Sequence, residues 1–118
     1  ATQNNIAYGA VQNTAGEFLK ATTASVTAAA ASSVATMPAD FRVSITNAPG
    51  TGAYPISSFT WLLLYESPKD KAQSKQMVEF VKWALTTGQQ FADGLGYAPL
   101  PADVVRQELA ALATVQVQ

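Results

Sequence analysis

Residues 56–65, which read ISSFTWLLLY, restrict the fold of this chain more than any other segment. At the two-residue period of a β-strand, large apolar side chains fall on both of its sides. One side carries Phe59, Trp61, Leu63 and Tyr65, and the other carries Leu62 and Leu64. A strand that is apolar on both faces is typical of a sheet covered by helices on both sides. The segment therefore predicts a buried strand of an α/β protein.

The residues before this segment predict short strands and one helix. Residues 6–11 predict a strand that stops at the turn-forming residues 12–16, and residues 41–45 alternate apolar and polar side chains like a half-buried edge segment. Residues 25–33 predict an Ala-rich helix with a smooth face, capped by preceding Thr and Ser. A low-complexity linker is the alternative there, but the absence of Gly and Pro argues against it. Pro and Gly exclude regular structure from residues 47–55.

After the apolar segment, the pattern predicts a helix. Ser67 is the expected cap, Pro68 suits the first helical position, and Asp70 complements the helix dipole. Gly88 is the expected stop. The apolar stripe consists of Met77, Phe80, Val81, Ala84 and Leu85.

The end of the chain predicts two more helices. A short one covers residues 89–95 and ends at Gly96, and residues 97–101 form an extended crossing. The last helix starts with Pro101 and Asp103. Its expected buried residues are Val105, Leu109 and Leu112. The order strand, helix, edge strand, strand, helix, helix predicts an α/β fold.

Composition excludes several kinds of function. The chain has no Cys and no His, which removes thiolate nucleophiles, imidazole bases and nearly every zinc, copper or haem site. Its net charge is −1, and it lacks the clustered basic face that nucleic acid requires, so we expect no nucleic-acid partner. No run approaches the roughly 20 apolar residues that span a bilayer. The start has neither a signal-peptide pattern nor an initiator Met, so we expect a processed, trimmed or partial chain.

Possible chemical motifs are weak. The sequence Gly50-Thr51-Gly52 lacks the following Gly, Lys and Ser/Thr of a phosphate-binding P-loop and leads into the predicted strand, so a tight turn is expected. Ser57 and Ser58 have no Lys placed to activate them. The acidic residues are explained by helix starts and solvated surface. We therefore predict no catalytic residue, no metal site, no cofactor and no enzyme activity.

Four runs of residues, in this order, resemble the phosphate-specific substrate-binding proteins of ABC transporters. They are QNNIAY (3–8), AYPISSFTWLLL (53–64), FVKWALTTGQ (80–89), and LGYAPLP (95–101) followed by Val104 and Val105. Together they span nearly the whole chain. The resemblance implies the C-terminal portion of a two-lobed, periplasmic-binding-protein-like α/β receptor whose lobes close by a hinge motion.

The resemblance also implies a division of the chain and a function. Residues 1–53 would be the remainder of the second lobe, and residues 54–118 the hinge crossing strand and C-terminal helices of the first lobe. The whole receptor would capture inorganic phosphate for an ABC permease, in the periplasm or at the cell surface. The family holds the anion through an early Ser/Thr pair, a Ser and an Asp in the first lobe, and an Arg with a Ser-Gly-Thr turn in the second. These precede the matched region, so we expect no phosphate-binding residue in this chain, and Arg42 is not that Arg.

Other hypotheses remain open from the sequence. The chain could be an isolated self-associating interaction module without ligand binding, because segments removed from a sheet leave unpaired edges. A companion chain carrying the N-terminal part could complete it instead. A phosphoesterase on the same scaffold is the third possibility, and no residue set supports it. The anion that is chosen, the origin of the chain and its oligomeric state are not fixed by these residues.

Overall fold

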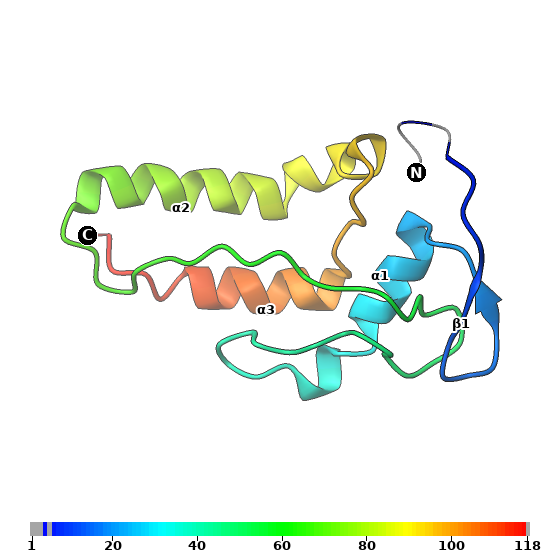
Figure 1. Cartoon of the computed structure of the whole chain (residues 1–118). Coiled ribbons are helices and arrows are strands. Elements are labelled where there is room, and N and C mark those ends of the chain that lie inside the picture. Colours follow the sequence, from blue (N-terminus) through cyan, green and yellow to red (C-terminus); the bar gives the residue numbers. More distant parts are fainter. Residues whose placement is uncertain (1–3, 5, 118) are drawn as a thin grey trace.

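The computed structural model describes residue 4 and residues 6–117 and shows helices combined with one short β-hairpin (Figure 1). In chain order the elements are β1 (Val11–Gln12), β2 (Phe18–Leu19), α1 (Thr23–Ala31), η2 (Val34–Thr36), α2 (Lys71–Leu85), η3 (Thr87–Phe91), η4 (Asp93–Leu95) and α3 (Ala102–Leu112). The η elements are 3₁₀ turns. Over this part of the chain, no helix has both the length and the apolar character needed to cross a bilayer. Part of the first resembling run, residues 3 and 5, lies outside the described residues.

The N-terminal hairpin only partly matches the strand predicted for residues 6–11. Regular pairing is confined to β1 and β2, with Val11 opposite Leu19 and Gln12 opposite Phe18. The predicted turn is confirmed: the Gly16 amide donates to the Asn13 carbonyl at 3.0 Å, and Gly16 takes a φ of +81°, which suits Gly. Residues 6–10 have no strand partner in the described chain, so the strand prediction is wrong for them.

Helix α1 confirms the Ala-rich helix predicted for residues 25–33, with both ends two residues earlier. Thr22 caps it in a reciprocal arrangement: its hydroxyl oxygen accepts from the Ser25 amide at 3.1 Å, and the Ser25 hydroxyl oxygen accepts from the Thr22 amide at 3.0 Å. The small side chains of α1 let neighbouring backbone approach closely. The hydrophobic cluster at this end of the molecule consists of Ala29, Ala30, Ile45, Ala48 and Ala53, with Phe59 packed against it.

Two predicted strands do not form. Residues 41–45 are irregular: Phe41 has a φ of +60°, and the Val43 amide folds back to the Phe41 carbonyl. Residues 56–65 contain no strand: residue 56 is in a bend, and Figure 1 shows the chain beyond it running as an extended stretch along α3. A strand requires a hydrogen-bonded partner, and the described chain supplies none to either segment. Residues 47–55 are irregular, as predicted.

Helix α2 starts and stops at residues other than those predicted. Asp70 is its cap and accepts from the Gln73 amide at 2.9 Å, whereas the Ser67 hydroxyl donates to the Gln116 side chain. The predicted stop at Gly88 is also wrong. The helix ends at Leu85 and is capped by Thr86, whose hydroxyl donates to the Lys82 carbonyl at 2.7 Å, and Gly88 belongs to η3.

The apolar faces of α2 and α3 are only partly buried. Val81 of α2 is buried, but Met77 and Phe80 from the predicted stripe are exposed. In α3, Leu112 is buried as predicted and Val104 is fully buried, while Val105 and Leu109 are half-buried. The two helices pack beside each other and run in opposite directions (Figure 1). The predicted extended crossing before α3 is confirmed, and η4 ends at Gly96 with a φ of +79°.

The molecule is extended and leaves much surface uncovered. Its radius of gyration is 16.2 Å, against about 13.5 Å expected for a compact domain of this length. Its accessible surface is 8133 Å², against roughly 6,100 Å² expected from its mass. The difference of about 2,000 Å² means that the chain buries less of itself than an ordinary monomer does.

Candidate functional site

The Gly50–Gly52 turn lies against the tip of the hairpin. The Gly52 amide donates to the Glu17 carboxylate at 2.7 Å, and the Thr14 hydroxyl donates to the Ala48 carbonyl at 3.3 Å. Gly50 and Gly52 have φ values of +111° and +72°, a region that disfavours side chains. The Gly52 amide is thus already bound to a carboxylate of the same chain and is not available to an external anion. The turn predicted from the sequence is confirmed, and it holds the hairpin rather than an open anion cradle.

Asn13 organises this contact, and the sequence reasoning missed it. Its side chain is only 6% exposed. The side-chain oxygen accepts from the amides of Ala15 at 3.0 Å and Glu17 at 2.9 Å, while the nitrogen donates to the Glu17 carboxylate at 3.0 Å and the Ala53 carbonyl at 3.3 Å. The sequence QNTAG, with Asn ahead of a Gly turn, was the available signal, because Asn side chains bond to backbone two residues on.

The electrostatics of the hairpin contact favour an ionised Glu17. The hydrogen bond from the Gly52 amide, followed by that from the Asn13 side chain, lowers the pKa of Glu17 below its ordinary value. Lys20 is engaged elsewhere, because its ammonium group lies 5.6 Å from the centre of the Tyr8 ring. The contact therefore presents a negative group, which is unsuited to a second anion.

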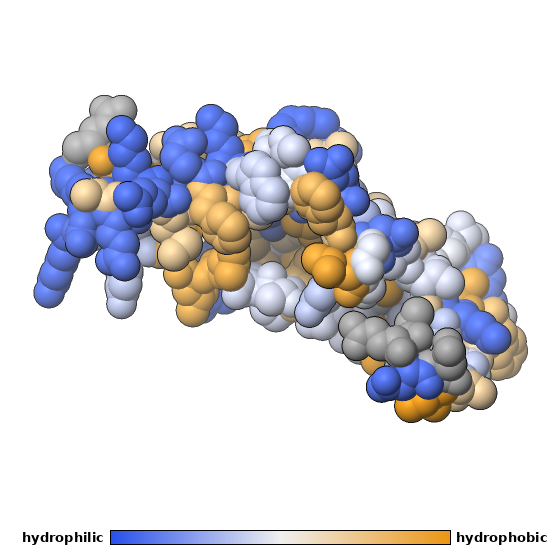
Figure 2. All heavy atoms as spheres, turned by 90° about the horizontal axis from the view of Figure 1, so that it is seen from above, coloured by the Kyte–Doolittle hydropathy of each residue, from blue (hydrophilic) through white to orange (hydrophobic). Residues whose placement is uncertain are grey.

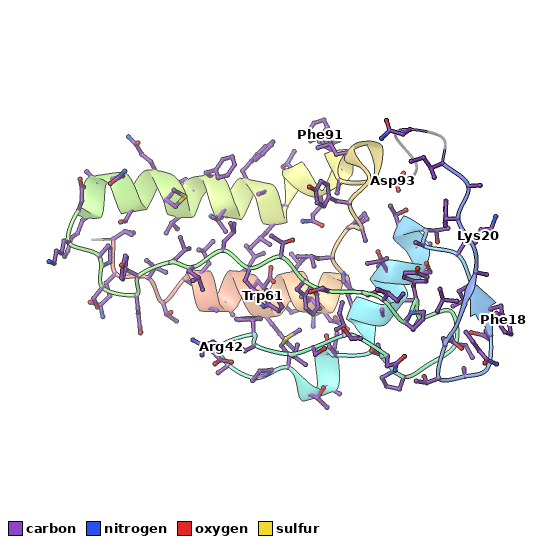
Figure 3. The ribbon with its side chains drawn as sticks, viewed as in Figure 1. Phe18, Lys20, Arg42, Trp61, Phe91 and Asp93 are labelled. Atoms are coloured by element: carbon purple, nitrogen blue, oxygen red, sulfur yellow. The ribbon has the colours of Figure 1, made fainter. Side chains whose placement is uncertain are left out.

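The remaining candidates from the sequence do not come together. The Ser57 hydroxyl is buried and donates to the Tyr54 carbonyl at 2.8 Å, so it is not a free nucleophile. Arg42 lies 3.5 Å from Asp40 on the exposed surface. Figure 3 shows Arg42 and Lys20 at well-separated parts of the molecule, so these two cations form no common anion site. Within the described residues, no acidic cluster of metal-binding size occurs.

The carboxylates on helices have local roles. Asp70 caps α2, and Asp103 pairs with Arg106 one turn later. Asp93 accepts from the Thr23 hydroxyl, which ties η4 to the start of α1. Each of these three carboxylates thus has a partner on its own helix or on a neighbouring element.

A shallow hollow lies beside α3, lined by Met37, Phe41, Phe59, Thr60, Trp61 and Glu108. Its walls are mainly apolar, and Trp61 uses its indole N–H to donate to the Phe41 carbonyl at 3.1 Å. Burial raises the pKa of Glu108. The residues that line the hollow include no Lys or Arg, so nothing in its walls balances the charge of an oxyanion.

Residues 56–65, called here the open segment, are the most unusual surface of the chain. Among the described residues, none of their backbone amides donates a hydrogen bond. Leu63 is 90% exposed and Tyr65 is 84% exposed. An extended backbone with free amides and large apolar side chains is a surface for pairing with another chain. The open segment therefore combines exposed apolar side chains with amides that donate to none of the described residues.

Comparison with known proteins gives close sequence relatives. No family model matches the chain. It is 40% identical to the phosphate-binding protein PstS of Xylella fastidiosa over 107 residues, 91% of this chain and 29% of that protein. It is 35% identical to PstS of Haemophilus influenzae over 105 residues, and 32% identical to PstS of Methanocaldococcus jannaschii over 128 aligned positions, which cover 98% of this chain and 33% of that protein. The chain thus spans about a third of the length of these relatives, and the resemblance inferred from the sequence is confirmed.

Proposed function

We propose that this chain, which is related in sequence to about a third of the phosphate-binding protein PstS, is the C-terminal portion of a solute-binding protein that captures inorganic phosphate for import by an ABC transporter. The observation that carries the proposal is the match over 91% of this chain to a protein named for phosphate binding. The share of the relative that is covered, 29%, agrees with a portion of such a receptor. The ABC permease is the proposed membrane partner, and the periplasm or cell surface the proposed location.

The proposed receptor has two lobes, with residues 1–53 in the second and residues 54–118 forming the hinge crossing and the end of the first. The distribution of apolar contacts supports this division. All five buried members of the hydrophobic cluster around α1 lie before residue 54, and only Phe59 joins them from beyond it. The crossing follows directly after Tyr54, whose amide donates to the Ser25 carbonyl at 3.0 Å.

The proposed phosphate ligands lie outside these 118 residues. Two observations support this placement: the Gly52 amide is bound to Glu17, and Arg42 is exposed beside Asp40. The role of this chain is then to complete the receptor and not to hold the anion itself. Binding without turnover is proposed because the relatives are named as binding proteins and the Ser57 hydroxyl is bound to backbone.

Calorimetric titration with inorganic phosphate tests the proposal. One sample is the chain itself, and the other is a chimaera in which it replaces the matched residues of the Xylella fastidiosa protein. We expect no heat of binding from the chain alone and one phosphate bound per chimaera. Binding by the chain alone would contradict the ligand placement. A chimaera that folds but binds no phosphate, while the unmodified relative does, would contradict the function.

A second candidate is the isolated self-associating module, which the free amides of the open segment favour. In that case two copies would cover each other's apolar residues without any ligand. Sedimentation of the chain at concentrations from micromolar to millimolar separates the two functions. A species of twice 12.4 kDa supports the module, and a monomer argues against it.

A further inference from the structure

We propose that a small set of side-chain hydrogen bonds, called here the clasp, sets the relative orientation of the two proposed lobes and thereby the affinity of the whole receptor for inorganic phosphate. The clasp consists of Thr23 and Thr27 of α1, Asp93 of η4, and Pro99. Its members act on the anion only through the lobes, so they are positioning residues. The inference rests on the proposed function and on the proposed division of the chain before residue 54.

Two hydrogen bonds form the clasp. The Thr23 hydroxyl donates to the Asp93 carboxylate, and the Thr27 hydroxyl donates to the Pro99 carbonyl at 2.8 Å. Residues at this spacing in a helix lie on one face, one turn apart. The two threonines therefore reach two successive pieces of the C-terminal part, and Figure 3 shows Asp93 above the start of α1.

The Asp93 carboxylate also complements the start of α1. Thr23 is the first residue of this helix, and its first turn contains no acidic residue of its own. A negative group is stabilised at a helix N-terminus, and a hydroxyl that donates to a carboxylate forms a stronger bond than one between neutral groups. Asp93 is exposed, however, and solvent weakens its interactions. The bond of Thr27 is partly buried, so we expect it to contribute more to the clasp.

Each side of the clasp is fixed to its own lobe. In the first lobe, the Gln89 side chain accepts from the Leu100 amide at 2.8 Å and donates to the Ala84 carbonyl at 3.1 Å. These bonds tie the crossing that carries Pro99 to the end of α2. In the second lobe, α1 belongs to the hydrophobic cluster through two of its alanines. Because both supports are held in place, the bonds of the clasp persist only in a narrow range of lobe orientations.

The other hydrogen bonds between the two lobes restrict their orientation less. The Gln107 side chain of α3 reaches the Val34 carbonyl at 3.4 Å, which is near the limit for a hydrogen bond. The Trp61 indole donates to Phe41, which belongs to an irregular segment that can follow a movement of the lobe. The rest adjoin the crossing itself and involve Tyr54, Pro55 and Ser57.

The shape of the molecule makes the orientation of its lobes sensitive to a few bonds. The molecule measures 49 × 32 × 20 Å, and Figure 2 shows it from above, with hydrophobic residues around a depression in its middle. A ligand held between two lobes binds more tightly when their orientation is fixed in advance, because less conformational freedom is lost on binding. The clasp is therefore expected to raise the affinity for phosphate.

Phosphate titration of the chimaera tests the clasp. Thr27→Val removes the hydroxyl and keeps the branched shape of the side chain, whereas Thr27→Ser keeps the hydroxyl. We expect Thr27→Val to raise the Kd for phosphate about fivefold, and Thr27→Ser to leave it within about twofold. Gln107→Ala, at the long bond to Val34, is the matched control and should also leave the Kd within about twofold. An unchanged or lower Kd in Thr27→Val would overturn the inference.

A distance measurement tests the clasp without phosphate, so that it can be judged even if the proposed function fails. The chain has no Cys, so spin labels attach only at Ala15→Cys in the hairpin turn and Gln76→Cys in α2, which are both exposed positions. We expect double electron–electron resonance to give a narrow distribution of label distances in this chain. The distribution should broaden when Thr23→Val and Thr27→Val are added.

The outcomes of the two experiments are separable. An unchanged width in the folded double variant, checked by circular dichroism, would overturn the clasp. A broader distribution together with an unmodified chimaera that binds no phosphate would support the clasp as a link between the lobes and reject the proposed function.

Discussion

Residues 11–54 and the open segment are separated by one residue, Pro55, yet they differ completely in how their polar groups are satisfied. In the first region, the hairpin tip, the turn at Gly50 and helix α1 exchange hydrogen bonds through Asn13, Glu17 and Tyr54. In the second, no amide donates to any of the described residues, and Leu63 is 90% exposed. The comparison teaches that the first region is held by hydrogen bonds within the described chain, whereas the amides of the second region take no part in such bonds.

Of the substitutions considered, Asn13→Ala should lower the stability of the chain most, because it removes hydrogen bonds that hold residues 11–54 together. Asn13→Ala removes a buried side chain that satisfies two amides and a carbonyl, and we expect a loss of about 2–3 kcal/mol in the free energy of unfolding. Urea denaturation measures this loss. The control is Gln12→Ala, whose exposed side chain makes one bond to the Gly16 carbonyl and should contribute less than about 0.5 kcal/mol. Similar values for both variants would contradict the role of Asn13.

Removal of the α2 cap should have a smaller effect. Asp70→Ala loses the bond to the Gln73 amide and is expected to destabilise the chain by about 1 kcal/mol. Ser67→Ala is the matched control, because the Ser67 hydroxyl bonds to the Gln116 side chain and not to the helix start. Thermal unfolding followed by circular dichroism compares the two. A larger loss of stability in Ser67→Ala than in Asp70→Ala would show that Ser67 caps α2, as the sequence predicted.

Acid should weaken the hairpin contact and act oppositely on Glu108. Glu17 has a lowered pKa in the folded chain, so its contribution is present above the usual glutamate pKa of about 4.3 and is lost as pH falls through the folded value. Burial raises the pKa of Glu108, so that group opposes folding increasingly as pH rises through the usual value. Melting temperatures measured from pH 3 to 7 test both assignments. The melting temperature of Glu17→Gln should fall less in acid than that of the unmodified chain. The melting temperature of Glu108→Gln should exceed that of the unmodified chain near neutral pH. The reverse pattern would reject these assignments.

Substitution in the open segment should have the smallest effect on the chain alone. Leu63→Ser removes a side chain that is 90% exposed, and we expect a change within about 0.5 kcal/mol in urea denaturation of the monomer. A serine at a buried apolar position, Val104→Ser, should destabilise the chain more than Leu63→Ser does, because Val104 is fully buried in α3. A loss at Leu63 that approaches the loss at Val104 would show that the two regions do not differ as described.

The sequence predicted those elements whose causes are local. Helix α1 follows from its alanines and the Thr22 cap, and the turn at Asn13 follows from its Asn and Gly residues. The order of the later helices was also correct. The Ser67 cap was wrong because two possible caps lie close together, and side-chain competition from Gln116 decided between them.

The strand prediction for residues 56–65 could not be met within this chain. Their pattern carries the signature of a fully covered sheet, but pairing is a property of two segments, and the second is absent from the described residues. Met77 and Phe80 are exposed for a similar reason, because a helical apolar stripe is buried only where another element packs on it, and none of the described residues covers these two. For the candidate site, sequence reasoning excluded the Gly50 turn as a phosphate loop but did not find Asn13. The location of the phosphate ligands outside these residues stays a prediction.

Hydrogen exchange of the chain alone tests the central claim most directly, because it reads both regions in one sample. The account predicts that the amides of Glu17, Gly52 and Tyr54, which are hydrogen-bonded, exchange much more slowly than those of residues 56–65 in a monomeric sample. Uniform protection across both regions would contradict the claim, because it would mean that the open segment already has its partners within the chain.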